Sequence, residues 1–139
     1  MANTVAEVMT RNPVTIEAGE PVAEAARRMR QADAGNVIVL DNGQVVGILT
    51  DRDITIRVVA DEKDYSTPAR EVCSTDDLQV VAPDTSIDQA VQIMRSKAIR
   101  RLPVVEGDRA VGVVSIGDLA IERDEDSALA EISAAEPTS

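Results

Sequence analysis

The chain has 139 residues and a formal net charge of −11, and its apolar residues are almost all aliphatic, with one tyrosine and no phenylalanine or tryptophan. The negative charge and the lack of aromatic rings count against nucleic acid as a partner, because that binding depends on basic and stacking side chains. The absence of histidine excludes imidazole bases and histidine-ligated metals, and the single cysteine, Cys73, cannot form an internal disulfide.

No apolar run of about 18 residues is present, and residues 1–4 lack the basic and apolar segments of a secretory signal. We therefore expect a cytoplasmic protein that does not contact a membrane. A chain of this length favours one compact core or two small halves that share a core.

The first half of the chain predicts alternating strands and helices. In its first long helix, Val22, Ala25, Ala26 and Met29 recur at the spacing of one buried stripe. The sequence Asp-Asn-Gly at 41–43 is typical of a hairpin turn between two strands. In chain order, the expected elements are a helical turn at 4–9, a strand at 14–16, a helix at 21–31, a central strand at 37–40, a strand at 45–49 and a helix from Thr50 to about residue 60.

The second half of the chain repeats the first. The segment 46–53 returns as 111–118, and in both an apolar run passes through glycine to a hydroxyl residue, with an aspartate three positions later. This pattern predicts a buried strand that ends at a helix start, where the hydroxyl and the aspartate form a capping box. A further capping box is expected at 85–88. The copies are offset by 65 residues, but the leading turn at 69–73 is offset by 64, because one residue is inserted between Asp76 and Val81.

These repeats define the predicted organisation of the chain. Residues 1–60 form the first repeat, 61–68 a linker, 69–121 the second repeat, and 122–139 an acidic, partly disordered tail. Two copies of one small unit favour a pair related by pseudo-twofold symmetry.

The order of these motifs resembles the tandem CBS (cystathionine-β-synthase) domain pair, also called a Bateman module. The likeness covers residues 5–121, and its features are the Val-x-x-Val-Met lead-in at 5–9, the helices ending in Met29 and Met94, the strand at 102–105 and the two Gly-apolar-apolar-(Thr/Ser)-x-x-Asp segments. The segment Thr50–Ile54 is most similar to short stand-alone bacterial members of the hypoxic response protein type. The resemblance implies an α/β (α+β) fold with one β-α-β-β-α unit per repeat, preceded by a short leading helix.

The resemblance also implies a function. The expected protein is a non-enzymatic regulatory module that binds an adenosyl ligand such as AMP or ATP in the cleft between its repeats and requires no cofactor. Its expected partners are an adenine nucleotide, a second copy of the chain and an unidentified effector protein. A ligand-free scaffold that dimerises through its CBS pair is the alternative. Catalysis is the weakest interpretation, because the sequence has no Walker motif and no cysteine with an activating base.

The two Thr/Ser-x-x-Asp segments suggest the binding residues. Asp53 can accept hydrogen bonds from vicinal sugar hydroxyls, while Thr50 and the free amides of a helix start can meet a phosphate. Family resemblance adds Arg100 and Arg101 as the positive charges for this first cleft. The remaining residues expected to contact ligand are Thr15, Ile16, Ala34 and Val37 around the adenine of the first cleft, and Val81, Ile99, Ser115 and Asp118 in the second.

The two clefts are predicted to be unequal. The first repeat has Gly35 and Asn36 where the second has Arg100 and Arg101, so the second cleft lacks the matching cation. It would then be weak, empty or suited to an uncharged adenosyl group. Simpler explanations remain open: capping alone accounts for both Thr/Ser-x-x-Asp segments, the basic run at 95–101 can be a solvated surface, and Arg52 and Arg57 can form surface pairs or dimer contacts. No catalytic or metal-binding residue is expected.

Overall fold

The computed structural model describes residues 3–74 and 78–123. The predicted acidic tail lies outside this range from residue 124 onward, as does part of the segment with the inserted residue. The chain divides into two compact units. We call residues 12–78 with 107–110 the repeat-1 unit, and residues 1–11, 79–106 and 111–139 the repeat-2 unit.

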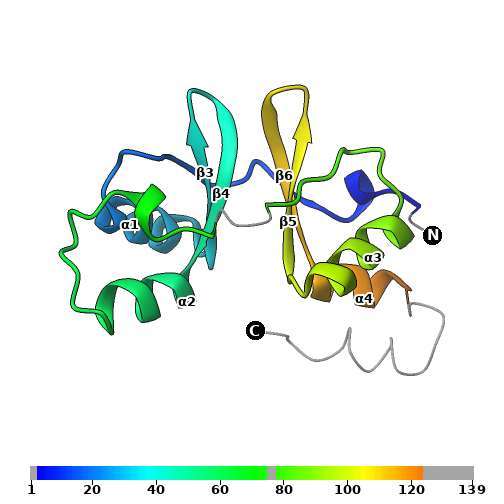
Figure 1. The fold of residues 1–139 in the computed structure, drawn as a ribbon. Coiled ribbons are helices and arrows are strands. Elements are labelled where there is room, and N and C mark those ends of the chain that lie inside the picture. The colour runs from blue at the N-terminus through cyan, green and yellow to red at the C-terminus, as the bar shows by residue number, and fades with distance from the viewer. Residues whose placement is uncertain (1–2, 75–77, 124–139) are drawn as a thin grey trace. The chain divides into compact units, whose positions relative to one another are not determined.

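The repeat-1 unit contains a three-stranded sheet with the predicted central strand. The strand order is β2-β3-β4, with β2 and β3 parallel and β3 and β4 antiparallel. In Figure 1, α1 and α2 lie on the same side of the β3–β4 hairpin. The elements are β2 (Thr15–Glu17), α1 (Val22–Ala32), β3 (Asn36–Asp41), β4 (Gln44–Thr50), α2 (Asp51–Ile54), the π-helical turn η2 (Thr55–Val59) and the 3₁₀ turn η3 (Ala69–Glu71).

Apolar spacing and turn residues account for these elements. Helix α1 buries Val22, Ala25 and Met29 against the sheet and ends where Asp33 takes a left-handed conformation, with φ of 52°. The hairpin at Asn42 and Gly43 has φ of 52° and 83°, as the favoured tight turn between twisted strands requires. The predicted helix–strand–hairpin–helix order of the first repeat is confirmed.

The buried stripe of α1 is narrower than predicted. Ala26 is exposed, although its spacing placed it with Val22, Ala25 and Met29. Ala26 lies at the edge of this stripe. At the equivalent position of the second repeat, the larger Val91 packs against the core.

The helix that follows β4 is also less regular than predicted. After α2 it continues as η2, where the Ala60 N–H bonds to the Thr55 carbonyl at 2.9 Å, five residues back. Val58 is fully buried, whereas the neighbouring Val59 is 54% exposed. The wider turn changes which side chains face the core.

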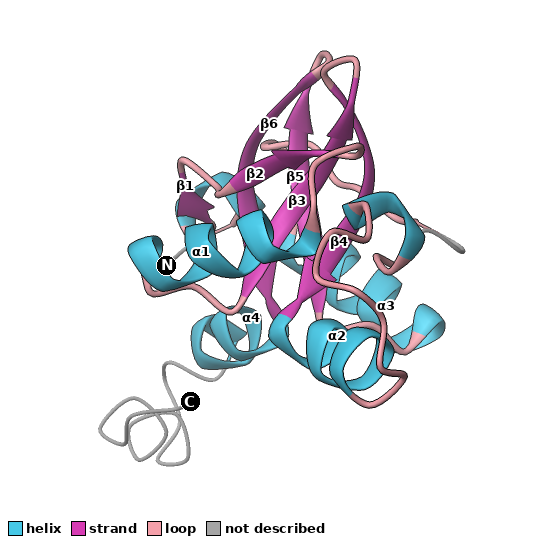
Figure 2. Ribbon diagram, turned by 90° about the vertical axis from the view of Figure 1, so that its left-hand side faces the viewer, coloured by secondary structure: helices cyan, strands magenta, loops and turns pink. Residues whose placement is uncertain are grey.

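The repeat-2 unit has the same plan with one strand reduced. Its sheet order is β1-β6-β5, and Figure 2 shows this unit from a second direction. Where the first repeat has β2, the second has only an isolated parallel bridge between Val81 and Val104. The elements are the 3₁₀ turn η1 (Val5–Glu7), β1 (Thr10–Arg11), α3 (Ile87–Lys97), β5 (Arg101–Glu106), β6 (Arg109–Ser115) and α4 (Ile116–Arg123).

The predicted capping box at Thr85 is wrong by one residue. Helix α3 begins after Ser86, whose Oγ accepts from the Gln89 N–H at 3.1 Å. Thr85 Oγ1 instead accepts from the Ala82 N–H at 3.0 Å. Ser86 is held in an extended conformation by a bridge to Thr4, so the helix cannot start earlier.

The two lead-in segments, residues 3–11 and 67–74, are exchanged between the repeats. The lead-in of the first repeat belongs to the repeat-2 unit, where Val5 N–H bonds to the Thr85 carbonyl at 2.9 Å. In the repeat-1 unit, Ala69 N–H bonds to the Glu20 carbonyl at 2.8 Å, the equivalent contact. The strand pairings are also equivalent: Thr10 pairs with Val113, and Ser74 pairs with Ile48.

Each unit has its own aliphatic core, completed by a lead-in. Val5 is buried in the cluster with Leu102 and Leu119, while Ala69 and Val72 are buried in the cluster with Leu49. The α/β fold class and the aliphatic core are confirmed, whereas the exchange was not predicted.

Candidate functional site

The Thr50-x-x-Asp53 segment forms a complete capping box at the end of β4. The Asp53 N–H donates to Thr50 Oγ1 at 3.0 Å, and the Thr50 N–H donates to Asp53 Oδ2 at 3.0 Å. The Asp51 N–H bonds to the Gly35 carbonyl at 3.0 Å, which fixes the start of α2 beside β3. This cap uses Oδ2 of Asp53 and leaves Oδ1 outside it.

The Ser115-x-x-Asp118 segment has the same arrangement in the repeat-2 unit. The Asp118 N–H donates to Ser115 Oγ at 3.1 Å, and the Ser115 N–H donates to Asp118 Oδ2 at 3.3 Å. The Ile116 N–H bonds to the Arg100 carbonyl at 2.8 Å, equivalent to the bond between Asp51 and Gly35. The capping boxes predicted at the two Thr/Ser-x-x-Asp segments are therefore confirmed.

Arg57 contacts the carboxylate of the first box. Its Nε lies 4.0 Å from Asp53 Oδ1, and its Nη1 donates to the Val72 carbonyl at 3.2 Å. The Arg57 side chain is 48% exposed and that of Asp53 14% exposed. From the sequence, Arg57 is expected in surface pairs or dimer contacts; its spacing of four residues from Asp53 is the signal that could have identified this ion pair.

Four other predicted residues share the repeat-1 unit with Thr50 and Asp53: Thr15, Ile16, Ala34 and Val37. Ile16 and Val37 are 1% and 0% exposed, so their side chains belong to the core and only their backbone is available to a ligand. The Ala34 N–H donates to the Met29 carbonyl at 2.9 Å and is therefore not available to a ligand.

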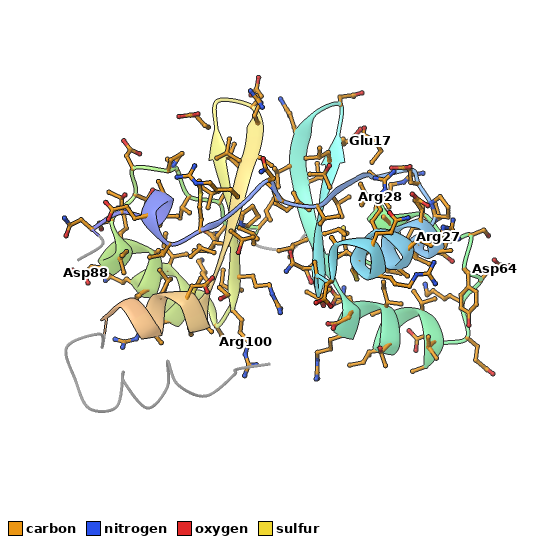
Figure 3. The ribbon with its side chains drawn as sticks, turned by 180° about the vertical axis from the view of Figure 1, so that it is seen from behind. Glu17, Arg27, Arg28, Asp64, Asp88 and Arg100 are labelled. Atoms are coloured by element: carbon orange, nitrogen blue, oxygen red, sulfur yellow. The ribbon has the colours of Figure 1, made fainter. Side chains whose placement is uncertain are left out.

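The remaining predicted residues, Val81, Ile99, Arg100, Arg101, Ser115 and Asp118, lie in the repeat-2 unit. Arg100 is exposed, and Figure 3 labels its side chain. Val81 is only 5% exposed. The convergence of Arg100 and Arg101 with Asp53 joins residues of different units, and it stays a prediction.

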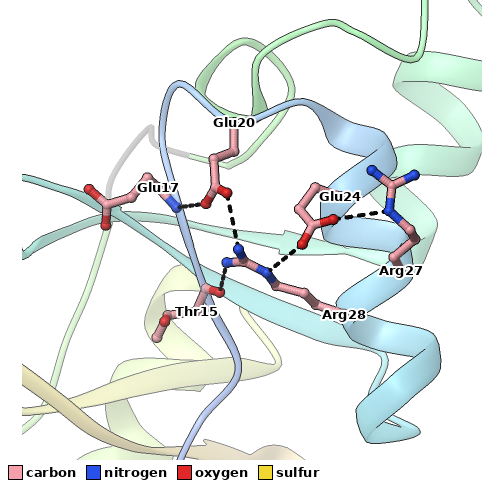
Figure 4. Close-up of polar contacts among 6 residues, drawn as sticks. All are labelled: Thr15, Glu17, Glu20, Glu24, Arg27 and Arg28. Atoms are coloured by element: carbon pink, nitrogen blue, oxygen red, sulfur yellow. Dashed lines mark hydrogen bonds and ion pairs between the residues drawn. The ribbon is translucent and has the colours of Figure 1, made fainter.

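An ionic network joins α1 to the backbone of Thr15 (Figure 4). Arg28 donates from Nη1 to the Thr15 carbonyl at 2.7 Å, from Nη2 to Glu20 at 3.0 Å and from Nε to Glu24 at 3.0 Å. Hydrogen bonds from Arg27 and then from Arg28 lower the pKa of Glu24. The second repeat has Ile93, Thr85 and Gln89 at the positions of Arg28, Glu20 and Glu24, so this network belongs to the first repeat.

Cys73 lies close to the first box but is not a reactive group. It is 5% exposed, and burial raises the pKa of its thiol. The charge of Asp53 acts in the same direction and that of Arg57 opposes it. The thiol is therefore neutral at neutral pH, as a buried structural cysteine should be.

Two surface hollows of about 390 Å³ each lie in the repeat-1 unit. Thr15 is the predicted site residue that lines one of them, together with Asn12, Pro13, Leu40, Gly43, Arg109 and Ala110. The other is lined by Val58, Val59, Glu62, Lys63, Asp64 and Tyr65. Neither of these two hollows is lined by Asp53, so the candidate site is argued from the chemistry of its capping box.

Within residues 3–74 and 78–123, no three cysteine, aspartate or glutamate side chains are grouped so that they could hold a metal ion. In the same part of the chain, every helix is too short or too polar to cross a bilayer.

Residues 5–60 and 69–125 each match the CBS domain. The chain therefore belongs to the CBS domain family and carries two CBS repeats, which confirms the resemblance. It is 39% identical over 121 residues to the CBS domain-containing protein YhcV of Bacillus subtilis, a match covering 87% of this chain and 86% of that protein.

Two further relatives bear on the sequence-based expectations. Hypoxic response protein 1 of Mycobacterium tuberculosis is 30% identical over 118 residues, covering 84% of this chain and 82% of that protein. The structure of the CBS domain protein PAE2072 from Pyrobaculum aerophilum, complexed with AMP, is similar with a TM-score of 0.76 and 27% identity. That match covers 86% of this chain and 92% of the other.

Proposed function

We propose that this CBS pair is a non-enzymatic regulatory module that binds an adenosyl ligand of the AMP or ATP class. The observation that carries the proposal is the state of Asp53: one carboxylate oxygen completes the helix cap, while Oδ1 lies outside it on a partly exposed side chain. An ionised carboxylate oxygen is an acceptor suited to the hydroxyls of a ribose. The AMP complex of the similar protein PAE2072 supports this class of ligand.

The proposal assigns separate tasks to the predicted residues. Asp53 receives the ribose hydroxyls, and the Thr50 hydroxyl lies toward the phosphate. The expected free amides are not available at the start of α2, because the N–H groups of Asp51, Arg52 and Asp53 already donate to Gly35, Asp51 and Thr50. Arg100 and Arg101 supply positive charge, and the adenine lies along the backbone near Thr15 and Val37. Asp118 and Ser115 would serve a second, weaker site, since the first repeat offers Gly35 and Asn36 in place of the two arginines.

Titration calorimetry with AMP and ATP tests the proposal. Asp53→Ala should weaken AMP binding at least tenfold, whereas Asp118→Ala should have a smaller effect. Asp53→Asn is the matched variant, because its amide oxygen can still accept the Thr50 N–H while the charge is lost. If Asp53→Asn keeps both the stability and the AMP affinity of the wild type, the ribose assignment is wrong. Equal losses in Asp53→Ala and Asp118→Ala would contradict the inequality of the two sites.

A ligand-free scaffold is the second candidate, and the complete hydrogen bonding of both capping boxes favours it. Thermal unfolding separates the two functions. A ligand that binds only the folded state raises the melting temperature progressively with its concentration. No shift with AMP, ATP or S-adenosylmethionine would support the scaffold.

Signalling would require a partner, and we propose a second copy of the chain in the cytoplasm together with an effector protein. The exposed apolar side chains of Ile56 and Val59, 46% and 54% exposed on η2, suit such a contact. Ile56→Lys combined with Val59→Lys should then yield a monomer in sedimentation equilibrium. An unchanged mass for this double variant would exclude η2 as the dimer surface.

A further inference from the structure

The ion pair between Arg57 and Asp53 lies within one unit. Arg57 Nε is 4.0 Å from Asp53 Oδ1, and Nη1 is held by the Val72 carbonyl at 3.2 Å. The Nη2 group has no hydrogen bond to any residue that the structure describes. The guanidinium is thus held by one hydrogen bond and one ion pair, and its Nη2 presents a pair of N–H donors beside Asp53 Oδ1, the carboxylate oxygen that the helix cap does not use.

We propose that Arg57 selects phosphorylated ligands at the Asp53 site by donating to the phosphate while Asp53 accepts from the ribose. This inference rests on the proposed function and adds a residue and a selectivity to it. Residues four apart on a helix present their side chains about 5–6 Å apart, which suits groups at the two ends of one sugar phosphate.

Electrostatics favours the same assignment. A carboxylate next to a phosphate repels it, and the exposed guanidinium of Arg57 brings the local charge of the pair to zero. Arginine is well matched to phosphate oxygens because its donors are planar and always charged. Because the guanidinium is already bonded to Val72, less freedom is lost when the ligand binds.

The pair is not required by the repeated fold. At the offset of 65 residues, Glu122 stands in α4 where Arg57 stands after α2, although Asp53 has its counterpart in Asp118. The second carboxylate therefore has no arginine at this position. Arg57 therefore marks the first carboxylate as the one adapted to an anionic ligand.

The test compares the affinities for AMP and adenosine, measured by calorimetry on the full chain. Arg57→Gln should lower the AMP affinity about tenfold, the usual size for loss of a charge-assisted hydrogen bond, and leave the adenosine affinity nearly unchanged. Arg57→Lys keeps the charge and should retain part of the preference for AMP. Arg52→Gln is the matched control, because it removes the same charge from an exposed position in α2, directly before η2.

The ratio of the AMP and adenosine affinities does not depend on the folded fraction. Destabilisation of the fold by loss of the hydrogen bond to the Val72 carbonyl would therefore leave this ratio unchanged. An Arg57→Gln ratio equal to that of the wild type, or an equal fall in Arg52→Gln, would overturn the inference and leave the proposed function standing. If the wild type binds neither AMP nor adenosine, the proposed function fails and this inference falls with it.

Discussion

The Arg28 guanidinium bonds to the Thr15 carbonyl at 2.7 Å, and this bond ties α1 directly to β2. The same guanidinium bonds to Glu20 and Glu24, so three acceptors converge on one side chain that is 32% exposed. Arg27, one residue earlier, has a single partner and is 52% exposed. The two neighbouring arginines therefore offer a direct comparison of a network with an isolated surface pair.

Arg28→Met should lower the free energy of unfolding by about 1–2 kcal/mol, because the Thr15 carbonyl loses its charged donor while the aliphatic stem is kept. Arg27→Met should change it by less than about 0.5 kcal/mol, as for most exposed pairs. Urea unfolding measures both. If both substitutions lower the free energy of unfolding equally, the three bonds of Arg28 stabilise the protein no more than the single ion pair of Arg27.

The network also predicts an acid dependence of stability. The pKa of Glu24 is lowered in the folded state, mainly by the hydrogen bond from Arg27 and then by that from Arg28. The contribution of ionised Glu24 to folding stability is therefore complete above the usual glutamate pKa. It is lost as the pH falls through the lower pKa that Glu24 has in the folded state. In Glu24→Gln, unfolding curves should show a smaller loss of stability across this acid range, and an unchanged loss would contradict the assignment.

The exchange of lead-ins predicts that a substitution in the first repeat destabilises the unit of the second. Val5 is 0% exposed in the cluster with Leu102, so Val5→Ala should lower the free energy of unfolding by about 2 kcal/mol. Hydrogen exchange should become faster in α3 before it does in α1. Val80→Ala is the control, because Val80 is 43% exposed. Faster exchange confined to α1 would contradict the exchanged arrangement.

Two glycines should respond to alanine in opposite directions. A Cβ at Gly112 would lie 2.9 Å from the Thr10 carbonyl oxygen and 2.5 Å from Met9 Sδ, so Gly112→Ala must displace β1. We expect a loss of about 1–3 kcal/mol. Gly117 is in α4 and meets only Ser115 Oγ at 3.7 Å, so Gly117→Ala should raise stability by about 0.5–1 kcal/mol. Thermal unfolding checks the signs, and a shift of both variants in the same direction would be inconsistent with this packing.

Cys73 should react slowly with thiol reagents while the protein is folded. It is 5% exposed and its pKa is raised by burial, so little thiolate forms near neutral pH. Iodoacetamide labelling should be much slower in buffer than in urea. The pKa of Cys73 is higher in the folded state than in the unfolded state. The contribution of the buried neutral thiol to folding stability is therefore complete below the usual thiol pKa of about 8.5 and is lost as the pH rises through the folded-state pKa. Rapid labelling of the native chain would show that the lead-in opens.

Local signals in the sequence identified most elements and both capping boxes. The Asp-Asn-Gly turn and the continuous apolar run of β3 act through near neighbours, and these predictions are confirmed. The same holds for the Thr50–Asp53 and Ser115–Asp118 boxes, whose partners are three residues apart. For the site itself, the ion pair between Arg57 and Asp53 was not predicted, although the two residues are four apart, and the sequence does not show that the Val72 carbonyl holds the guanidinium.

The errors occur where distant segments determine the outcome. The start of α3 depends on the bridge between Ser86 and Thr4, and the choice of Ser86 over Thr85 is not visible in the local pattern. The exposure of Ala26 is likewise not visible in its spacing, which is that of a buried stripe. Nothing in residues 3–11 themselves reveals that they complete a sheet whose other strands begin about 90 residues later along the chain.

The crossed placement of the lead-ins means that cutting the chain at residues 61–68 would not produce two self-sufficient modules. A fragment ending at residue 60 would carry Val5, which belongs to the other fragment's core, and would lack Ala69 and Val72, which fill its own. If the two fragments were made together, the lead-in segment of each fragment would be able to complete the core of the other. The two repeats therefore depend on each other for folding, because the lead-in segment of each repeat completes the core that the other repeat forms.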